Sequence, residues 1–398
     1  MDKRKLEKSL LKTWNWFTRS GVMLPSDGTW GVAERVMLTE GNEAKEKTLD
    51  SFPAWTEHKT HCIIEQRRAD CNMETAFLFL QIHKLFGDFK PFRKTALNLL
   101  DYLYCKSGLL HRKGEGNFPG TWEWSHIKFT HNIYFDDNAW MVVLPLKIAK
   151  MYPALDQKYQ MKEFALRLAR SLAEEAPAYL KGEVLPDRKF SFLGNIRLPH
   201  WGSLVCLALA EAFQADPSEI YLPFIRMYEE YLVQNADSFT TSEFAYAILG
   251  SSAAYYATGR QESLACAELF AGKILAAMNP ENGSIPSEHY EAPSGKGLAD
   301  TIYTMNWALL AMQNMAYLNT RYQEPYEKIL SLLLRIQDTT SAKHLKGCWR
   351  GMYDLENNCW GGGDRFEGGA NSIYTGWTNA PIAWAVAFEL SKSNLLIC

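Results

Sequence analysis

Apolar residues recur at helical spacing from one end of the chain to the other, and few segments show the strict alternation of a half-buried strand. Segments that fit the helical pattern are bounded by capping or helix-breaking residues. The predicted helices span residues 6–19, 72–86, 91–104, 138–152, 157–175, 201–214, 219–235, 242–258, 261–278, 300–320, 322–338 and 380–391. The pattern therefore predicts an all-α chain.

The predicted helices alternate in character along the chain. The first of each pair, such as 322–338, carries charge on one face, as expected of a helix beside water. The second, such as 380–391, is apolar on all sides and should be buried on all sides. Strict alternation of outer and inner helices predicts an (α/α)6 toroid, a closed ring of six helical hairpins, with residues 1–398 as a single domain. An open α-solenoid is the alternative, but no repeat of constant length supports it.

The linkers alternate as well. After an inner helix the chain turns quickly, as at Gly87-Asp88 and Gly259-Arg260. Long linkers rich in Gly, Pro and aromatic residues precede most inner helices, at 20–69, 107–135, 176–200, 279–299 and 339–379, and we expect short β-hairpins in them. Long irregular loops in a compact domain are usually functional. All of them belong to the end of the ring at which the inner helices begin, so we expect the site there.

Charge and composition narrow the choice of partner. The 42 basic and 45 acidic residues nearly balance, and no dense Lys/Arg stripe is present, which argues against nucleic acid or an anionic membrane. The chain has neither a signal-peptide core nor a run of eighteen apolar residues, so we expect a cytoplasmic protein; the mature form of an exported protein would look the same. Aromatic residues make up 13% of the chain, and their faces suit sugar rings as well as a core.

Two adjacent carboxylates, Asp136 and Asp137, precede the apolar helix predicted at 138–152. One interpretation is an N-cap, because Asp satisfies free backbone N–H groups and suits the positive end of the helix dipole. Capping explains one acid better than two, since like charges repel and one acid should hold its proton more tightly. Separated proton affinities are what a general acid and a nucleophile require. On this motif alone, capping and catalysis are equally supported.

Polar and aromatic residues stand in or beside the first turn of every predicted inner helix. With Asp136 and Asp137 as catalytic candidates, the candidate substrate-binding residues are Arg67, Asp70, Asn72, Glu74, Asn138, Trp140, His200, Trp201, Glu243, Tyr246, Asp300, Tyr303, Trp377 and Asn379. Taken singly, Asp70 and Asp300 fit capping and Trp140 fits the core. As a set they exceed what capping needs, because most helix starts use one capping residue. We therefore predict that they meet at one site.

Two candidate roles stay open. His200 can act as a general base, a ligand of sugar hydroxyls or a cap, and we favour the ligand role. Arg67 and Arg68 lie close to Asp70, and either an ion pair or recognition of a sugar carboxylate fits them.

No metal or cofactor is predicted. The histidines show no HExxH or paired Cys/His spacing, and the eight cysteines include no CxxC pair. The Asp136-Asp137 pair also suggests the Mg²⁺-binding DDxxD motif of terpene cyclases, but position 140 is Trp rather than an acid.

The glycine-rich segment 346–379 carries Trp349, Trp360 and Trp377. Glycine permits close backbone approach and hinge-like freedom. We interpret the segment as a lid or the wall of a sugar subsite, with Trp349 and Trp377 as binding residues. Disorder is the alternative, and the interleaved aromatic residues count against it.

The helix alternation resembles that of the six-hairpin glycosidase superfamily over nearly the whole chain. The segment Tyr134-Phe135-Asp136-Asp137-Asn138-Ala139-Trp140 resembles the aromatic-Asp-Asp-Asn-x-Trp segment of glycoside hydrolase family 76, the endo-α-1,6-mannanases. By this resemblance Asp136 is the nucleophile and Asp137 the acid/base. Unsaturated glucuronyl hydrolases share the ring, but their signature is not found. N-acylglucosamine 2-epimerases share it too and rely on histidines, for which His200 and His289 are the candidates.

The leading hypothesis is therefore a glycosidase that acts on an oligo- or polysaccharide. The alternatives are a sugar epimerase with His200 as base, a non-catalytic glycan-binding protein, and an enzyme acting on uronic acids, a lyase or an unsaturated uronyl hydrolase, in which Arg67 and Tyr303 take part.

Overall fold

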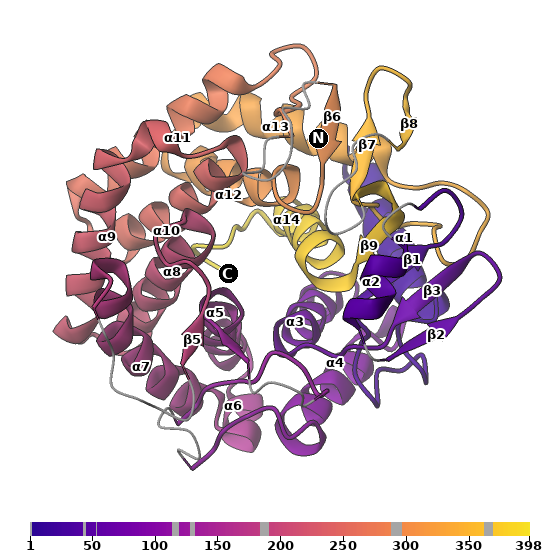
Figure 1. Ribbon diagram of the computed structural model, residues 1–398, viewed down its shortest axis with the longest axis horizontal. Helices are drawn as coiled ribbons and strands as arrows, with labels where there is room; N and C mark the ends of the chain where they lie inside the picture. Colours follow the sequence, from indigo (N-terminus) through magenta and orange to yellow (C-terminus); the bar gives the residue numbers. More distant parts are fainter. Residues whose placement is uncertain are drawn as a thin grey trace.

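The helices of the protein form two concentric rings (Figure 1). The computed structural model describes residues 2–42, 45–52, 54–113, 119–127, 132–183, 191–287, 297–361 and 369–398. The inner ring contains α3 (Ala69–Phe86), α5 (Phe135–Met151), α8 (Pro199–Ala215), α10 (Thr241–Thr258), α12 (Met305–Leu318) and α14 (Ala380–Ser391). The outer ring contains α1 (Lys3–Arg19), α4 (Phe92–Asp101), α7 (Met161–Lys181), α9 (Leu222–Gln234), α11 (Gln261–Ala277) and α13 (Gln323–Ile336). The short helices α2 (Lys45–Ser51) and α6 (Pro153–Tyr159) lie in the connections.

Each inner helix packs against the next one along the chain, and α14 packs against α3 and so closes the ring. The predicted (α/α)6 toroid is confirmed. Burial follows the predicted alternation: residues 135–149 of α5 are buried on every side, whereas α13 buries Ile329, Leu330 and Leu333 and exposes Glu324 and Glu327. An inner helix has neighbours all round, so only a helix without a polar stripe fits there.

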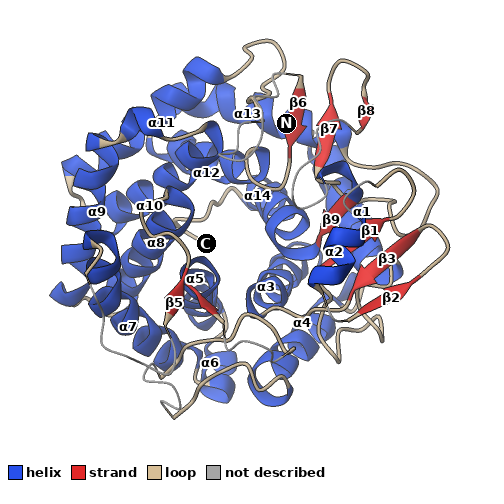
Figure 2. Ribbon diagram, viewed as in Figure 1, coloured by secondary structure: helices blue, strands red, loops and turns tan. Residues whose placement is uncertain are grey.

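The short strands lie in the long linkers, as predicted, and join linkers that are far apart in sequence (Figure 2). They are β1 (Arg35–Leu38), β2 (Trp55–Glu57), β3 (His61–Ile64), β4 (Ile133–Tyr134), β5 (Phe192–Leu193), β6 (Leu298–Asp300), β7 (Met352–Asp354), β8 (Cys359–Trp360) and β9 (Ser372–Tyr374). Strand order is β2-β3-β1-β9 in one antiparallel sheet and β6-β7-β8 in another, and β4 pairs with β5 in parallel. The pairing of β1 with β9 places Arg35 opposite Tyr374 and ties the first linker to the last.

Two predicted helix boundaries are wrong. The helix expected at 157–175 breaks at Gln160, which has a left-handed φ of 57° and separates α6 from α7. The helix expected from Asp300 begins only at Met305, because Asp300 ends β6 in register with Met352. In the described residues, no helix is both long enough and apolar enough to span a lipid bilayer.

Three imidazole rings stack where the β2–β3 turn meets the segment after α13. The His58 and His61 centroids are 4.5 Å apart and those of His61 and His344 4.0 Å, with the planes within 13° of parallel. The carbonyl of His344 accepts a hydrogen bond from Trp16 Nε1 of α1. The stack therefore joins the edge of the sheet to the outer ring.

We predict that this stack makes the protein less stable in acid. Burial, helped by the neighbouring His344 and His58 rings, lowers the pKa of His61 to about 4, whereas an unfolded histidine titrates at about 6.5. Between these values the unfolded chain binds more protons than the folded one, so the free energy of unfolding falls as pH drops from about 6.5 to about 4. The ring is only half-buried, so screening by water limits the loss to the order of 1 kcal/mol.

Thermal unfolding of the protein and of His61→Asn, at neutral pH and at about pH 4.5, measures this effect. The variant should lose less stability in acid than the parent. His83→Asn, a half-buried histidine outside the stack, is the matched control. Equal acid sensitivity of the parent and His61→Asn would show that the stack does not titrate as described.

Candidate functional site

Two adjacent carboxyl groups stand in the first turn of α5, which begins at Phe135. Asp136 is 5% exposed, and its Oδ2 lies 3.0 Å from Nε2 of His200 on α8. Asp137 is 2% exposed, and its Oδ1 accepts a hydrogen bond of 2.5 Å from Nη2 of Arg68. Both contacts reach the start of a neighbouring inner helix, so the sequence-adjacent acids have different partners.

Arg68, the residue before α3, holds carboxylates from three segments of the chain. Its Nε and Nη2 donate to the two oxygens of Asp70 at 3.1 and 2.7 Å, and its Nη1 donates to Glu34 Oε1 at 3.3 Å. The guanidinium carbon lies 5.6 and 5.5 Å from the ring centroids of Trp124 and Trp377. Sequence reasoning missed Glu34 and Trp124, which lie in linkers with no periodic pattern.

The expected ion pair with Asp70 is made by Arg68 and not by Arg67. The Arg67 side chain pairs with Glu65, with Nη1 2.8 Å from Oε2, and its backbone N–H donates to Nδ1 of His126. The sequence offered one signal for the Arg68–Asp70 pair: in Arg-x-Asp at 68–70, Arg68 is the residue before α3 and Asp70 lies in its first turn.

His200 lies between aromatic rings in the first turn of α8. Its ring stacks on Trp201 at 4.5 Å and on Tyr246 of α10 at 4.8 Å, with interplanar angles of 11° and 2°. Its backbone N–H donates to Glu243 Oε2 at 2.7 Å. The stacking on both rings, the backbone bond to Glu243 and the contact of Nε2 with Asp136 Oδ2 together fix the orientation of the His200 side chain.

Five buried acids surround Arg68, and we call them the carboxyl cluster: Glu34, Asp70, Glu74, Asp136 and Asp137. Burial raises the pKa of Asp137 well above its usual range; Arg68 opposes this shift, and Asp70 and Asp136 add to it. Burial also raises the pKa of Glu74, with Asp70 adding to the shift, and the pKa of Glu243 on the far side of His200. Within the cluster, burial thus favours the protonated forms of Asp137 and Glu74.

Trp377 ties the last linker to the carboxyl cluster. Its backbone N–H donates to Glu74 Oε2 at 2.9 Å and its indole N–H to Asp70 Oδ2 at 3.0 Å. Gly376 is required beside it, because a Cβ there would lie 2.2 Å from Glu74 Oε2 and 2.8 Å from Cys71 Sγ. The indole edge also faces the His200 ring, with centroids 5.1 Å apart.

A buried aromatic layer lies beneath His200 and Trp377. Trp140 of α5 and Trp307 of α12 stack at 5.4 Å, Trp307 meets Trp377 edge-on at 5.6 Å, and Tyr246 tilts against Trp307. Trp140 and Tyr246 are fully buried, so both pack in the core of the ring. Four half-buried aromatic residues surround this layer: Trp124 beside Arg68, Tyr134 near Asp136 and Asp137, and Trp201 and Tyr303 beside His200.

The three predicted asparagines share one structural task. In each case the side-chain oxygen accepts the N–H of a linker residue and the amide N–H donates to the carbonyl of that same residue. Asn72 grips Val32, Asn138 grips Trp122 and Asn379 grips Trp349, with bonds of 2.7–3.2 Å. Each amide also donates to a backbone carbonyl four or five residues earlier. All three are 0% exposed, so they fix linkers to inner helices and offer no surface to a sugar.

We predict that Asn138→Ala destabilises the fold by about 2–4 kcal/mol, because it leaves the Trp122 N–H and carbonyl without their partner in a buried place. Chemical unfolding measures the loss. Asn235→Ala, which removes one bond to Tyr231 at the end of outer helix α9, should cost much less. Equal losses of stability in the two variants would show that the paired hydrogen bonds of Asn138 to Trp122 do not fix the linker as described.

Trp349 and Asp300 also have structural surroundings. Trp349 is 0% exposed, and its indole N–H donates to the Leu333 carbonyl of α13, so the prediction that it binds substrate is not supported. Asp300 accepts hydrogen bonds from Ile302 N and Thr304 Oγ1, at 2.9 and 3.2 Å, and caps the turn before α12. Residues 362–368 of the proposed lid and His289 lie outside the described residues.

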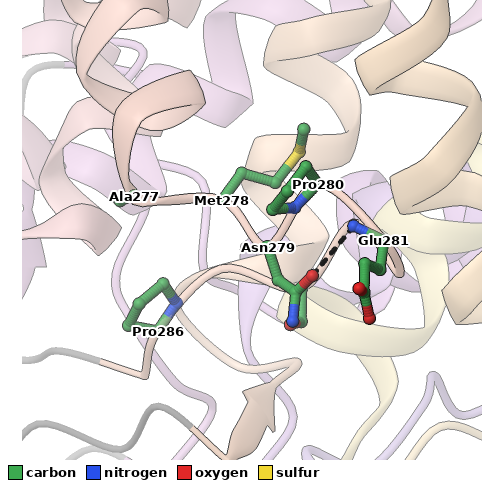
Figure 3. A pocket seen from close by; sticks show the side chains of 7 residues that line it. Ala277, Met278, Asn279, Pro280, Glu281 and Pro286 are labelled. Carbon is green, nitrogen blue, oxygen red and sulfur yellow. Dashed lines mark hydrogen bonds between the residues drawn. The ribbon is translucent and has the colours of Figure 1, made fainter.

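Within the described ranges, no group of three or more His, Cys, Asp or Glu side chains is arranged to hold a metal ion. Figure 3 shows a pocket elsewhere, in the connection after α11, lined by Ala277, Met278, Asn279, Pro280, Glu281, Ser284 and Pro286. It contains none of the predicted site residues.

No protein-family model and no curated protein matches the chain. Similar solved structures cover nearly all of it. A D-mannose isomerase is 12% identical, with a TM-score of 0.64 and 98% of each chain covered. An inactive variant of an α-1,6-mannanase from a Salegentibacter species, in complex with α-1,6-mannotriose, is 12% identical, with a TM-score of 0.56 and 97% and 98% of the two chains covered. The chain has the six-hairpin glycosidase fold.

A mutant of unsaturated glucuronyl hydrolase from Streptococcus agalactiae has the same fold, with 12% identity, a TM-score of 0.58 and 100% and 93% of the two chains covered. The expected six-hairpin fold is therefore confirmed. Identities this low concern the fold alone, and the chemistry has to be argued from the site.

Proposed function

We propose that this protein is a carbohydrate-active enzyme that hydrolyses a glycosidic bond with Asp136 and Asp137. The observation that carries the proposal is the different surroundings of these two adjacent acids. Asp137 is held among other acids in a place where burial favours its protonated form, whereas Asp136 lies against His200. A general acid and a nucleophile need such a separation.

The proposed roles follow from these surroundings. Asp137 donates its proton to the glycosidic oxygen as the bond between that oxygen and the anomeric carbon breaks. Asp136 Oδ1, which has no hydrogen-bond partner among the described residues, attacks the anomeric carbon. Water then cleaves the ester between the sugar and Asp136, and Asp137 accepts a proton from that water. The half-buried rings of Trp201 and Tyr303 lie beside His200, the partner of Asp136, and can pack against the sugar.

One comparison supports the same pair. The similar α-1,6-mannanase variant is inactive with two sequence-adjacent aspartates replaced by asparagines, and it binds α-1,6-mannotriose. The local resemblance of residues 134–140 to that family, and this precedent, make an α-1,6-linked mannan the first substrate to test.

We predict that Asp136→Asn and Asp137→Asn each reduce glycan hydrolysis about a hundredfold to ten-thousandfold while the protein stays folded. Reducing ends released from α-1,6-mannan and from a panel of other glycans measure turnover, and thermal unfolding checks the fold. Asp338→Asn is the matched control, since Asp338 is also a buried acid paired with an arginine, Arg350, in a different part of the ring. Retained turnover with lower stability in the Asp136 and Asp137 variants would show that the pair only supports the helix.

Azide separates the two roles. In Asp136→Gly, azide should restore turnover and yield a glycosyl azide of inverted anomeric configuration, because it takes the place of the missing nucleophile in a single displacement. In Asp137→Gly, azide should instead attack the glycosyl ester of Asp136 and yield a glycosyl azide of retained configuration; the opposite pair of products would reverse the assignment of the acids.

Sugar isomerisation is the second candidate, and a specific observation favours it. The His200 ring is held between two aromatic rings with Nε2 on Asp136, an arrangement that suits a base for abstracting a proton next to a carbonyl. A D-mannose isomerase is also among the similar structures, so isomerisation of a free sugar has to be tested.

We predict that incubation with free mannose or cellobiose leaves their configuration unchanged, as followed by NMR. His200→Gln should lower hydrolysis less than Asp137→Asn does, because His200 contacts Asp136 without carrying the transferred proton. Conversion of the free sugar, lost in His200→Gln, would replace the hydrolase proposal. Tight glycan binding with no conversion of any kind would favour a binding protein.

A further inference from the structure

Asp70 is completely buried at the start of α3, so it offers no surface to a substrate. It nevertheless accepts three hydrogen bonds from neighbouring donors. Two come from the Arg68 guanidinium, one to each carboxylate oxygen, and the third from the Trp377 indole at 3.0 Å. Several N–H donors and a cation in contact stabilise the ionised form of a carboxyl group.

Trp377 is held in a strained conformation to make its bond. Its φ of 40° and ψ of −49° are unusual for a residue with a side chain. Its N–H is fixed by Glu74 Oε2, its indole by Asp70, and its carbonyl accepts a bond from Asn306 of α12. Strained backbone persists only where the surroundings fix it, and such places concentrate at functional sites.

Asp70 and Asp137 lie close together because both contact the same nitrogen of Arg68: its Nη2 donates to Asp70 Oδ2 at 2.7 Å and to Asp137 Oδ1 at 2.5 Å. Two buried carboxyl groups this close repel each other when both are ionised, which favours a state in which one of them carries a proton. Asp137 shares a single Arg68 N–H, whereas Asp70 accepts the guanidinium fork and the indole. Asp70 therefore has more hydrogen-bond donors than Asp137, which favours placing a proton held by the pair on Asp137.

We propose that Asp70 is a positioning residue, whose negative charge beside the Asp137 carboxyl group keeps a proton on Asp137 for delivery to the glycosidic oxygen. This proposal rests on the proposed hydrolysis. The other ionisable groups around the pair are Glu34 and Arg35 beside β1, Arg68, Cys71 and Glu74 on or beside α3, and Tyr134 and Asp136 on β4 and α5.

In a plot of hydrolysis rate against pH, the high-pH limb is the range in which the rate falls as the general acid loses its proton. Two substitutions should move this limb in opposite directions. Asp70→Asn removes a negative neighbour and supplies an N–H donor, so Asp137 loses its proton more easily and the limb moves down by about one pH unit or more. Trp377→Phe keeps a ring but removes the donor that stabilises ionised Asp70, so the limb moves up by a smaller amount. Asp338→Asn should leave the limb in place. A purely structural role for Asp70 would lower the rate or the stability without these shifts.

Infrared difference spectra of the full chain test the proton itself, independently of activity. In the difference between variant and parent at neutral pH, one component of the protonated-carboxyl absorption should be missing in Asp137→Asn and weakened in Asp70→Asn, but kept in Asp338→Asn, while the components from other buried acids such as Glu74 and Glu243 remain in all three. Loss in Asp70→Asn with retention in Asp137→Asn would place the proton on Asp70 and overturn the proposal. An unchanged rate profile in Asp70→Asn would overturn it as well. If the spectra behave as expected but the parent hydrolyses no glycan, the placement of the proton on Asp137 stands and the proposed hydrolysis fails.

Discussion

The burial of several acids around one guanidinium is the interaction on which this structure depends. Arg68 contacts Asp70, Asp137 and Glu34 at once, and two indoles cover its faces. The five acids of the carboxyl cluster outnumber the two arginines that contact it, Arg68 and Arg35, so burial favours protonation of part of the cluster. Burial raises the pKa of Asp137 beside Arg68, whereas Asp136 in the same helix turn contacts His200, and such different surroundings are what acid–nucleophile chemistry requires.

The ring is what brings these groups together. Six inner helices begin at the same end, and contacts among Asp70, Asp137, His200 and Trp377 connect segments separated by up to about three hundred residues. The linkers that complete the site carry little regular structure, and buried asparagines at the helix starts fix them in place. The outer ring and the short sheets support the inner ring, and the first turns of the inner helices carry the acids and His200.

The fold was predictable because the alternation of amphipathic and all-apolar helices is a direct consequence of two concentric layers. The location of the acid pair was predictable because α5 is apolar beyond its first turn, which makes Asp136 and Asp137 conspicuous. The partners were not predictable. A sequence cannot tell whether Asn138 points toward a ligand or toward the backbone of its own linker. Nor does residue type separate a tryptophan that packs in the core, as Trp349 does, from one that lines a sugar subsite. The sequence named both Arg67 and Arg68 near Asp70 but could not tell which of them pairs with it, because the exact start of α3 decides which side chain faces Asp70.

The most direct measurement is a crystal structure of Asp137→Asn with an α-1,6-linked mannan oligosaccharide bound. The account predicts a glycosidic oxygen within hydrogen-bond distance of residue 137, about 3 Å, and the anomeric carbon facing Asp136 Oδ1 at roughly 3–3.5 Å. A sugar bound with its reducing-end carbonyl against His200, or a saccharide bound away from both aspartates, would contradict it.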